Sequence, residues 1–137
     1  MSKENAAKVE QLYQALNAHD YNALDELVAE DAVWHGMEAQ GLEGLKHDWA
    51  AFTTSFPDGH MKLEDLVDFG DKVVARNTCE GTNTGEFFGE PATGRSMSII
   101  EVGIYRFEGG KVVEGWSFTD GDGMMRQLGL APDAPVA

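Results

Sequence analysis

The fold is decided by the stretch Ser96-Met-Ser-Ile-Ile-Glu-Val-Gly-Ile-Tyr-Arg-Phe-Glu-Gly-Gly-Lys-Val-Val-Glu-Gly-Trp-Ser-Phe118. Apolar residues are frequent on both sides of Glu108-Gly-Gly110, and glycines between two such runs are typical of a hairpin turn. The sequence therefore predicts a long strand at about residues 96–107, a tight turn, and a second strand over residues 111–118.

The region before this hairpin has the pattern of strands as well. Apolar residues alternate from Met61 to Phe69, and Gly70-Asp71 predicts a tight turn into another strand over residues 72–82. A loop that contains glycine and proline, residues 88–94, separates this strand from the hairpin.

The first part of the chain is predicted to be mainly helical. Apolar residues from Val9 to Leu16 follow the helical spacing, and Asp20 is a suitable N-cap for a second, short helix. The other expected elements are a short strand at 31–35, a helix from Gly41 to the turn Phe56-Pro-Asp-Gly59, and a short helix around 124–128.

Helices followed by strands argue for an α+β domain in which a curved antiparallel sheet wraps onto the N-terminal helices. Such a sheet forms a cone whose interior is either a packed core or a ligand pocket. We expect residues 1–130 to form one domain and residues 131–137 to form a flexible tail.

The charge of the chain excludes some classes of partner. Of 137 residues 24 are acidic and 10 are basic, which gives a formal net charge of -14. Phosphate groups are repelled by such a chain, so neither nucleic acid nor an anionic membrane is an expected partner. The single cysteine, Cys79, and the lack of a visible signal peptide or membrane-length apolar run predict a cytoplasmic protein.

Asp120 is the carboxylate best placed for chemistry. It follows the apolar strand 111–118, where neighbouring rings would raise its pKa and make it a general acid/base. The alternative is that Asp120 caps the helix that follows, although Asp122 is the better cap of the two by pattern. Residue pattern alone leaves both interpretations open.

Other candidate residues are aromatic or charged. His35 at the end of its strand is a proton shuttle beside Asp120 or a structural histidine, and the aromatic side chains line a pocket or fill the core. Arg76 and Glu101 interrupt apolar strands, so they either pair with each other, face water or face a cavity. The aromatic candidates are Trp34, Phe52, Phe56, Phe87 and Trp116.

The sequence offers little support for metal or cofactor chemistry. The four histidines show no paired ligand spacing, and one cysteine supplies no zinc site, so no metal is expected. Gly-x-Gly-x-x-Gly and Gly-x-Ser-x-Gly do not occur, so neither a dinucleotide cofactor nor an elbow serine is predicted.

A series of short segments gives the chain a family resemblance. In order, they are His35, Gly41-Leu-Glu-Gly44, Phe56-Pro-Asp58, Gly70-Asp-Lys-Val-Val-Ala-Arg76, Gly81-Thr82, Thr84-Gly-Glu-Phe-Phe-Gly89, Pro91-Ala-Thr-Gly94, Arg106-Phe107, Gly110-Lys-Val-Val-Glu-Gly-Trp116, Asp120 and Gln127-Leu-Gly129. Over roughly residues 8–130, this order resembles the SnoaL-like polyketide cyclase family.

The resemblance implies the nuclear-transport-factor-2-like cone and an activity without a cofactor. In characterised cyclases of this family, the aspartate that matches Asp120 acts as acid/base in an intramolecular aldol ring closure on an aromatic polyketide. A homodimer that pairs through the outer face of the sheet is also implied. The same fold carries dehydratases, isomerases, epoxide hydrolases and binding proteins.

Two segments depart from the pattern of the family. The usual Gly-Thr-His is here Gly81-Thr82-Asn83, and the usual Glu-His-Trp is Glu114-Gly115-Trp116. Each departure removes a histidine, and Glu101 is an uncommon charge for its strand. The pocket is therefore expected to handle a different substrate, or none.

The sequence thus predicts a cofactor-independent cyclase or isomerase that moves a proton on a small apolar or aromatic carbonyl compound. Asp120 is expected to remove a proton next to the carbonyl and to pass it to the developing oxyanion, and His35 is the other expected catalytic residue. The expected substrate-binding residues are Trp34, Phe52, Phe56, Arg76, Asn83, Met97, Glu101 and Trp116.

Two alternatives stay open. In the first, the chain is a non-catalytic ligand-binding or dimerisation module in which Asp120 only caps a helix. In the second, it resembles an epoxide hydrolase, in which Glu101, Arg76 and Asp120 converge on one water molecule.

Overall fold

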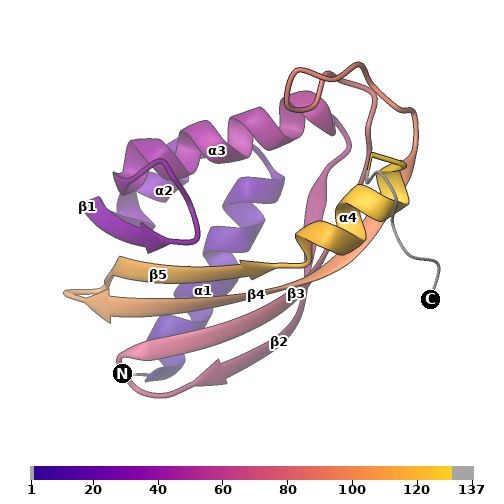
Figure 1. The fold of residues 1–137 in the computed structure, drawn as a ribbon. Coiled ribbons are helices and arrows are strands. Elements are labelled where there is room, and N and C mark those ends of the chain that lie inside the picture. The colour runs from indigo at the N-terminus through magenta and orange to yellow at the C-terminus, as the bar shows by residue number, and fades with distance from the viewer. Residues whose placement is uncertain (1, 131–137) are drawn as a thin grey trace.

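The computed structural model describes residues 2–130. Helices and strands follow one another in the order that the sequence predicts, with the helices mostly before the strands (Figure 1). The elements are α1 (Ser2–Asn17), α2 (Tyr21–Leu27), β1 (Val28–His35), α3 (Gly41–Ser55), β2 (His60–Asp68), β3 (Lys72–Thr82), β4 (Ser96–Glu108), β5 (Lys111–Thr119) and α4 (Gly121–Leu128).

Within residues 2–130 the strands form a five-stranded curved sheet in the order β1-β5-β4-β3-β2. The pairs β2–β3, β3–β4 and β4–β5 are antiparallel, as expected. The expected antiparallel sheet is present except at one edge, where β1 pairs with β5 in parallel. This pairing joins segments far apart in the chain, so no local turn signal announces it.

The helices cover one face of the sheet. Helix α1 packs against β2 and β3, α3 packs against β1, and α4 packs against β4. In Figure 1, α1 lies behind the sheet and α3 lies above its β1–β5 edge. We call the covered side the inner face and the opposite side the outer face. Val73 and Ala75 of β3 point to the inner face and are fully buried there.

A bulge in β5 determines which of its side chains reach the inner face. Arg106 of β4 pairs with Glu114, whereas the next residue, Phe107, pairs with Val112, so Val113 has no partner in the register. Uninterrupted alternation along this strand would place Val112 and Glu114 on one face, and the bulge prevents it. Val112 is buried on the inner face, and Glu114 lies on the outer face with Trp116 and Phe118.

Local signals in the sequence explain the ends of several elements. The carboxylate of Asp20 accepts a hydrogen bond from Ala23 N and caps α2, as predicted. Gly129 adopts a left-handed conformation directly after α4, where glycine is the favoured residue. None of the helices in the described part of the chain is both long and apolar enough to span a bilayer.

Candidate functional site

A pocket of about 690 Å³ lies between the inner face of the sheet and helices α1 and α3. Its walls are mainly apolar and aromatic, which is usual for a site that binds a small organic molecule. The large apolar side chains in the lining come from both halves of the chain and include Leu12, Leu16, Trp34, Trp49, Phe52, Met61, Phe87, Met97 and Ile99.

A row of polar side chains crosses the inner face beneath this pocket. Asn77 of β3, Glu101 of β4 and Thr119 of β5 are successive partners in the strand register. Asn77 Nδ2 donates to Glu101 Oε1 over 3.1 Å, and Thr119 Oγ1 donates to Glu101 Oε2 over 2.9 Å. The carboxylate is therefore held by one donor on each oxygen, and all three residues line the pocket.

Two tyrosine hydroxyls lie near this row. Tyr13 of α1 and Tyr105 of β4 approach edge to face, and their hydroxyl oxygens are 2.9 Å apart. Burial raises the pKa of both phenols, that of Tyr105 to about 12, so both stay protonated and able to donate hydrogen bonds. Both residues line the pocket.

Cys79 lies two residues after Asn77 on the same strand and also faces the pocket. The side chain is buried, as expected for a small core residue. Burial raises the pKa of its thiol, with Glu101 adding to the effect, so the group is a neutral thiol at physiological pH.

Asp120 is the N-cap of α4. Its Oδ1 accepts a hydrogen bond from Gly123 N over 2.9 Å, while the residue is exposed and does not belong to the pocket lining. The structure thus has the helix cap that the sequence left open, on Asp120 rather than on Asp122, which lies in the first turn of α4. Its predecessor Thr119 lines the pocket, so Asp120 lies next to the lining in the chain. The acid/base role of Asp120 stays a prediction.

Comparison with known proteins identifies the family. The family model described as SnoaL-like polyketide cyclase matches residues 7–128. The chain belongs to the SnoaL-like polyketide cyclase family.

Solved structures of similar proteins have the same fold. IdmH from Streptomyces antibioticus, described as a proposed polyketide cyclase, is 33% identical, with a TM-score of 0.83 over 91% of this chain and 98% of that chain. TsrD from Streptomyces laurentii is 30% identical, with a TM-score of 0.86 over 96% of this chain and 98% of that chain. AclR from Streptomyces galilaeus, described as a proposed hydroxylase, is 26% identical, with a TM-score of 0.85 over 98% of this chain and 91% of that chain. A comparison with curated protein sequences finds no match.

In this SnoaL-like chain, His35 does not lie beside Asp120. The strand register pairs His35 with Trp116, four residues before Asp120, which corresponds to about 13 Å along a strand. The imidazole stacks on Trp116 with ring centroids 5.1 Å apart, and Nε2 lies 2.7 Å from Glu114 Oε2. His35 is exposed, is not among the lining residues, and belongs to an outer-face cluster with Glu114 and Arg106.

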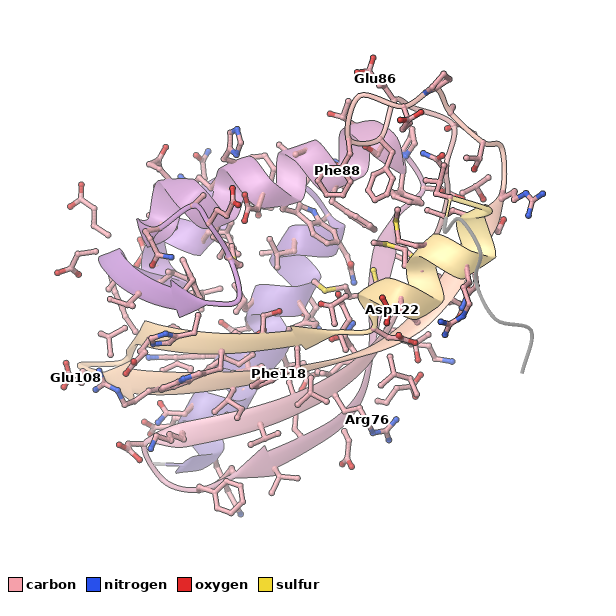
Figure 2. All side chains as sticks on the ribbon, viewed as in Figure 1. Arg76, Glu86, Phe88, Glu108, Phe118 and Asp122 are labelled. Atoms are coloured by element: carbon pink, nitrogen blue, oxygen red, sulfur yellow. The ribbon has the colours of Figure 1, made fainter. Side chains whose placement is uncertain are left out.

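Arg76 and Glu101 lie on opposite faces of the sheet, so the expected alternative that they pair is wrong. Arg76 projects from the outer face, where its nearest acidic partner is Asp65 at 3.9 Å. In Figure 2, Arg76 and Phe118 lie on the side of the sheet that faces the viewer, away from α1. A site in which Arg76, Glu101 and Asp120 grip one water molecule would need side chains from both faces, and the sheet lies between them.

Asn83 is fully buried at the base of the loop between β3 and β4, and the pocket lining does not include it. Its Nδ2 donates to the carbonyl oxygens of Ser55 and Gly85, and its Oδ1 accepts from the amide and hydroxyl of Thr93. These bonds use both donors and both acceptor positions of the amide, which ties the loop to the end of α3.

Most of the predicted apolar wall is present. Trp34, Phe52 and Met97 line the pocket, whereas Phe56 is buried in the core behind it. Trp116 borders the pocket too, but its register position places its ring on the outer face, where it stacks on His35. Glu101 was predicted from its position in an apolar strand, and it does face the cavity.

The glycine at position 115, where the family usually has a histidine, is explained by the position of Trp34. A Cβ atom on Gly115 would lie 2.5 Å from Cζ3 of Trp34, so the missing side chain leaves room for this indole. Trp34 Nε1 donates to Gly41 O over 2.8 Å, which fixes the ring in that space. The volume that a histidine would occupy is filled by tryptophan.

The sequence interpretation did not select Tyr13, Tyr105, Asn77 or Trp49. For Asn77 a signal was present, since it alternates with Val73, Ala75 and Cys79 and is a polar residue on a buried face. The tyrosines gave no such signal, because their contact joins residues 92 positions apart. Within residues 2–130, no three His, Cys, Asp or Glu side chains come together as ligands for a metal ion.

Proposed function

We propose that this protein is a cofactor-independent cyclase or isomerase that moves a proton on a small, largely apolar carbonyl compound. The observation that carries the proposal is the aromatic-walled pocket of about 690 Å³ with a hydrogen-bonded polar row on its floor. Its volume lies within the usual range of roughly 300–1,000 Å³ for small-molecule sites. An aromatic polyketide-like ligand fits both its size and its walls.

The reaction proposed is an aldol-type ring closure. A proton leaves the carbon next to one carbonyl, the resulting enolate attacks a second carbonyl of the same molecule, and the new alkoxide is protonated. Asp120 is proposed to exchange the proton with the substrate oxygen. Support comes from the family resemblance and from the position of Asp120, which is exposed and directly follows Thr119 of the lining.

The experiment uses acetophenone with an ortho acetonyl group, which closes to a fluorescent methylnaphthol with loss of water. Asp120→Asn is the decisive variant, because asparagine caps a helix about as well as aspartate but transfers no proton. Fluorescence should develop with the wild-type protein and be lost in Asp120→Asn, while Asp122→Asn serves as the matched control. An unchanged rate in Asp120→Asn would remove Asp120 from the mechanism.

A binding module without turnover is the second candidate. The observation that favours it is the hydrogen bond from Gly123 N to Asp120, which gives this carboxylate a structural task. Under this alternative the diketone binds, which is followed by changes in tryptophan fluorescence. The rate of ring closure is then the same in buffer alone, with the wild-type protein and with each variant.

The proposal includes a homodimer that pairs through the outer face of the sheet. Large apolar side chains are exposed on this face, with Ile100 58% and Phe118 57% accessible on neighbouring strands. Exposed apolar surface of this kind is typical of interfaces between proteins. Light scattering after size-exclusion chromatography tests it.

A further inference from the structure

Glu101 is the carboxylate at the centre of the pocket floor. Each of its oxygens accepts one hydrogen bond, from Asn77 or from Thr119, and a carboxylate oxygen has room for a second. The Cys79 thiol is a third neighbouring donor, and the lone pair that then remains is available to a ligand. Both partners are neutral, so no cation in direct contact neutralises Glu101.

The Tyr13–Tyr105 pair supplies a hydrogen-bond donor close to this carboxylate. A Cβ atom on Gly103 would lie 2.7 Å from the hydroxyl of Tyr105, so this hydroxyl lies over Gly103, two residues from Glu101 on the same face of β4. Two hydroxyls that share one hydrogen bond retain one further hydrogen. That hydrogen is free for a ligand oxygen.

We propose that Glu101 is the base that removes the carbon-bound proton of the ligand, and that the Tyr13–Tyr105 hydroxyl pair stabilises the oxyanion that forms. This inference rests on the proposed function and assigns its first step to a site distinct from Asp120. A base and an oxyanion donor are the two groups that enolate formation needs, and both project into the same cavity.

A carboxylate oxygen of Glu101 takes the proton from the carbon next to the carbonyl, the C–H electron pair becomes the double bond of the enolate, and the carbonyl π pair moves to oxygen. In ring closure the electron pair of the enolate C–C double bond forms the bond to the second carbonyl carbon, and the enolate oxygen re-forms its carbonyl. The π pair of the second carbonyl moves to its oxygen, which becomes an alkoxide. The alkoxide takes a proton from solvent through Asp120, and Glu101 releases its proton to water before the next turnover.

The charge of the lining also defines the ligand. Three acidic residues line the pocket, Glu38, Asp48 and Glu101, and in the part of the chain that the structure describes no lysine, arginine or histidine does so. An anionic ligand would be repelled without any compensating cation. The site therefore takes an uncharged ketone and rejects the same skeleton with a carboxylate.

The test separates proton removal from ring closure. Alpha-tetralone has protons next to its carbonyl but no second carbonyl, so exchange of these protons for deuterium, followed by NMR, reports the first step alone. Loss of a general base lowers a rate by about 100-fold or more, and this is the expected effect of Glu101→Gln. Tyr105→Phe should lower the rate by about 10-fold or more through loss of the donor.

Two further variants test whether a loss of exchange has another cause than the missing base. Glu101→Asp keeps the charge and should retain more exchange than Glu101→Gln, while Asp122→Asn should exchange at the wild-type rate. Thermal melts establish that each variant is folded. A carboxylate-bearing tetralone should neither bind nor exchange.

The outcomes distinguish the two proposals. If the wild-type protein exchanges the protons and Glu101→Gln exchanges them at the same rate, this inference is overturned and the proposed function stands. The distinction is clearest if Asp120→Asn abolishes the exchange. A wild-type protein that does not bind alpha-tetralone, or binds it without exchange above buffer, overturns both.

Discussion

Tyr105 lies with its hydroxyl directly over Gly103, the residue two positions before it on β4. Any Cβ at residue 103 would come within 2.7–2.9 Å of the phenol, so only glycine allows the ring to extend along its own strand towards Glu101. The contact between Tyr105 and Tyr13 depends on this placement, because the two hydroxyls are hydrogen-bonded partners across the pocket.

Gly103→Ala should therefore displace Tyr105 and break its bond to Tyr13. We expect a loss of about 1–3 kcal/mol in the free energy of unfolding, the usual cost of overpacking a filled site. Urea unfolding measures it. Gly121→Ala is the matched control, since no atom lies within 4 Å of a Cβ at residue 121, and a comparable loss there would contradict the steric explanation.

The indole of Trp34 and the backbone of Gly115 should be energetically coupled. Gly115→His, which installs the family's usual residue, is expected to cost about 1–3 kcal/mol because its Cβ would lie 2.5 Å from the indole. In a Trp34→Ala background this added cost should fall substantially. A double-mutant cycle by urea unfolding measures the coupling, and additive costs would show that Trp34 is not the obstacle.

Asn83 should prove structural rather than ligand-binding. Asn83→Ala leaves the amide of Thr93 and the carbonyl of Gly85 without their partner and removes one of two hydrogen bonds to the Ser55 carbonyl, and we expect it to cost about 2–3 kcal/mol of stability. Thr84→Ala, at an exposed neighbour, should change stability by about 0.5 kcal/mol or less. Weaker binding of alpha-tetralone in a fully stable Asn83→Ala protein would instead support the predicted contact with substrate.

Acid should weaken the outer-face cluster. Hydrogen bonds from His35 and Arg106 hold the pKa of Glu114 below its ordinary value of 4.5. A carboxyl whose pKa is lowered by folding contributes stability that is fully present above the unfolded pKa and is lost as the pH falls from there through the folded pKa. The free energy of unfolding should thus fall below about pH 4.5, and by less in Glu114→Gln.

Chemical denaturation at a series of pH values measures this effect. Glu86, which is exposed in the loop after β3, gives the control variant Glu86→Gln (Figure 2). If the free energy of unfolding depends on pH in the same way in Glu114→Gln and in the wild type, the cluster does not contribute to the pH dependence of stability.

Phe118→Glu should abolish pairing of two chains through the outer face. A buried carboxylate at the centre of an apolar interface is strongly unfavourable, and each Phe118 would meet the surface of the other copy. Light scattering should give the mass of a dimer for the wild type and of a monomer for Phe118→Glu. Phe69→Ser, at the exposed end of the β2–β3 hairpin, should leave the mass unchanged.

Much of the fold could be predicted from the sequence because its signals are local. Gly70-Asp71 and Gly109-Gly110 mark the hairpins, and Asp20 marks the start of α2 through the hydrogen bond that its own side chain accepts. The parallel edge of the sheet was missed, since the pairing of Trp34 with Gly115 joins strands separated by most of the chain.

The candidate site was predicted less well, and the bulge at Val113 in β5 shows the physical reason. Strict alternation from Val112 would place Trp116 and Phe118 on the inner face, and this made the aromatic residues before Asp120 look like a pocket wall. Because Val113 is unpaired, the parity of the strand changes, and Ser117 and Thr119 face the cavity instead. A change of parity depends on the neighbouring strand, so a single sequence does not announce it.

The same bulge makes Val113 a spare residue in the chain. Val112 pairs with Phe107, and Glu114 pairs with Arg106. If Val113 were absent, Val112 and Glu114 would be neighbours in the chain, as their partners Phe107 and Arg106 are. The hairpin can therefore shorten by one residue at this point while Thr119 still reaches Glu101. Loss of Val113 would keep Thr119 on the inner face, whereas one residue gained or lost after Glu114 would turn Thr119 to the opposite face.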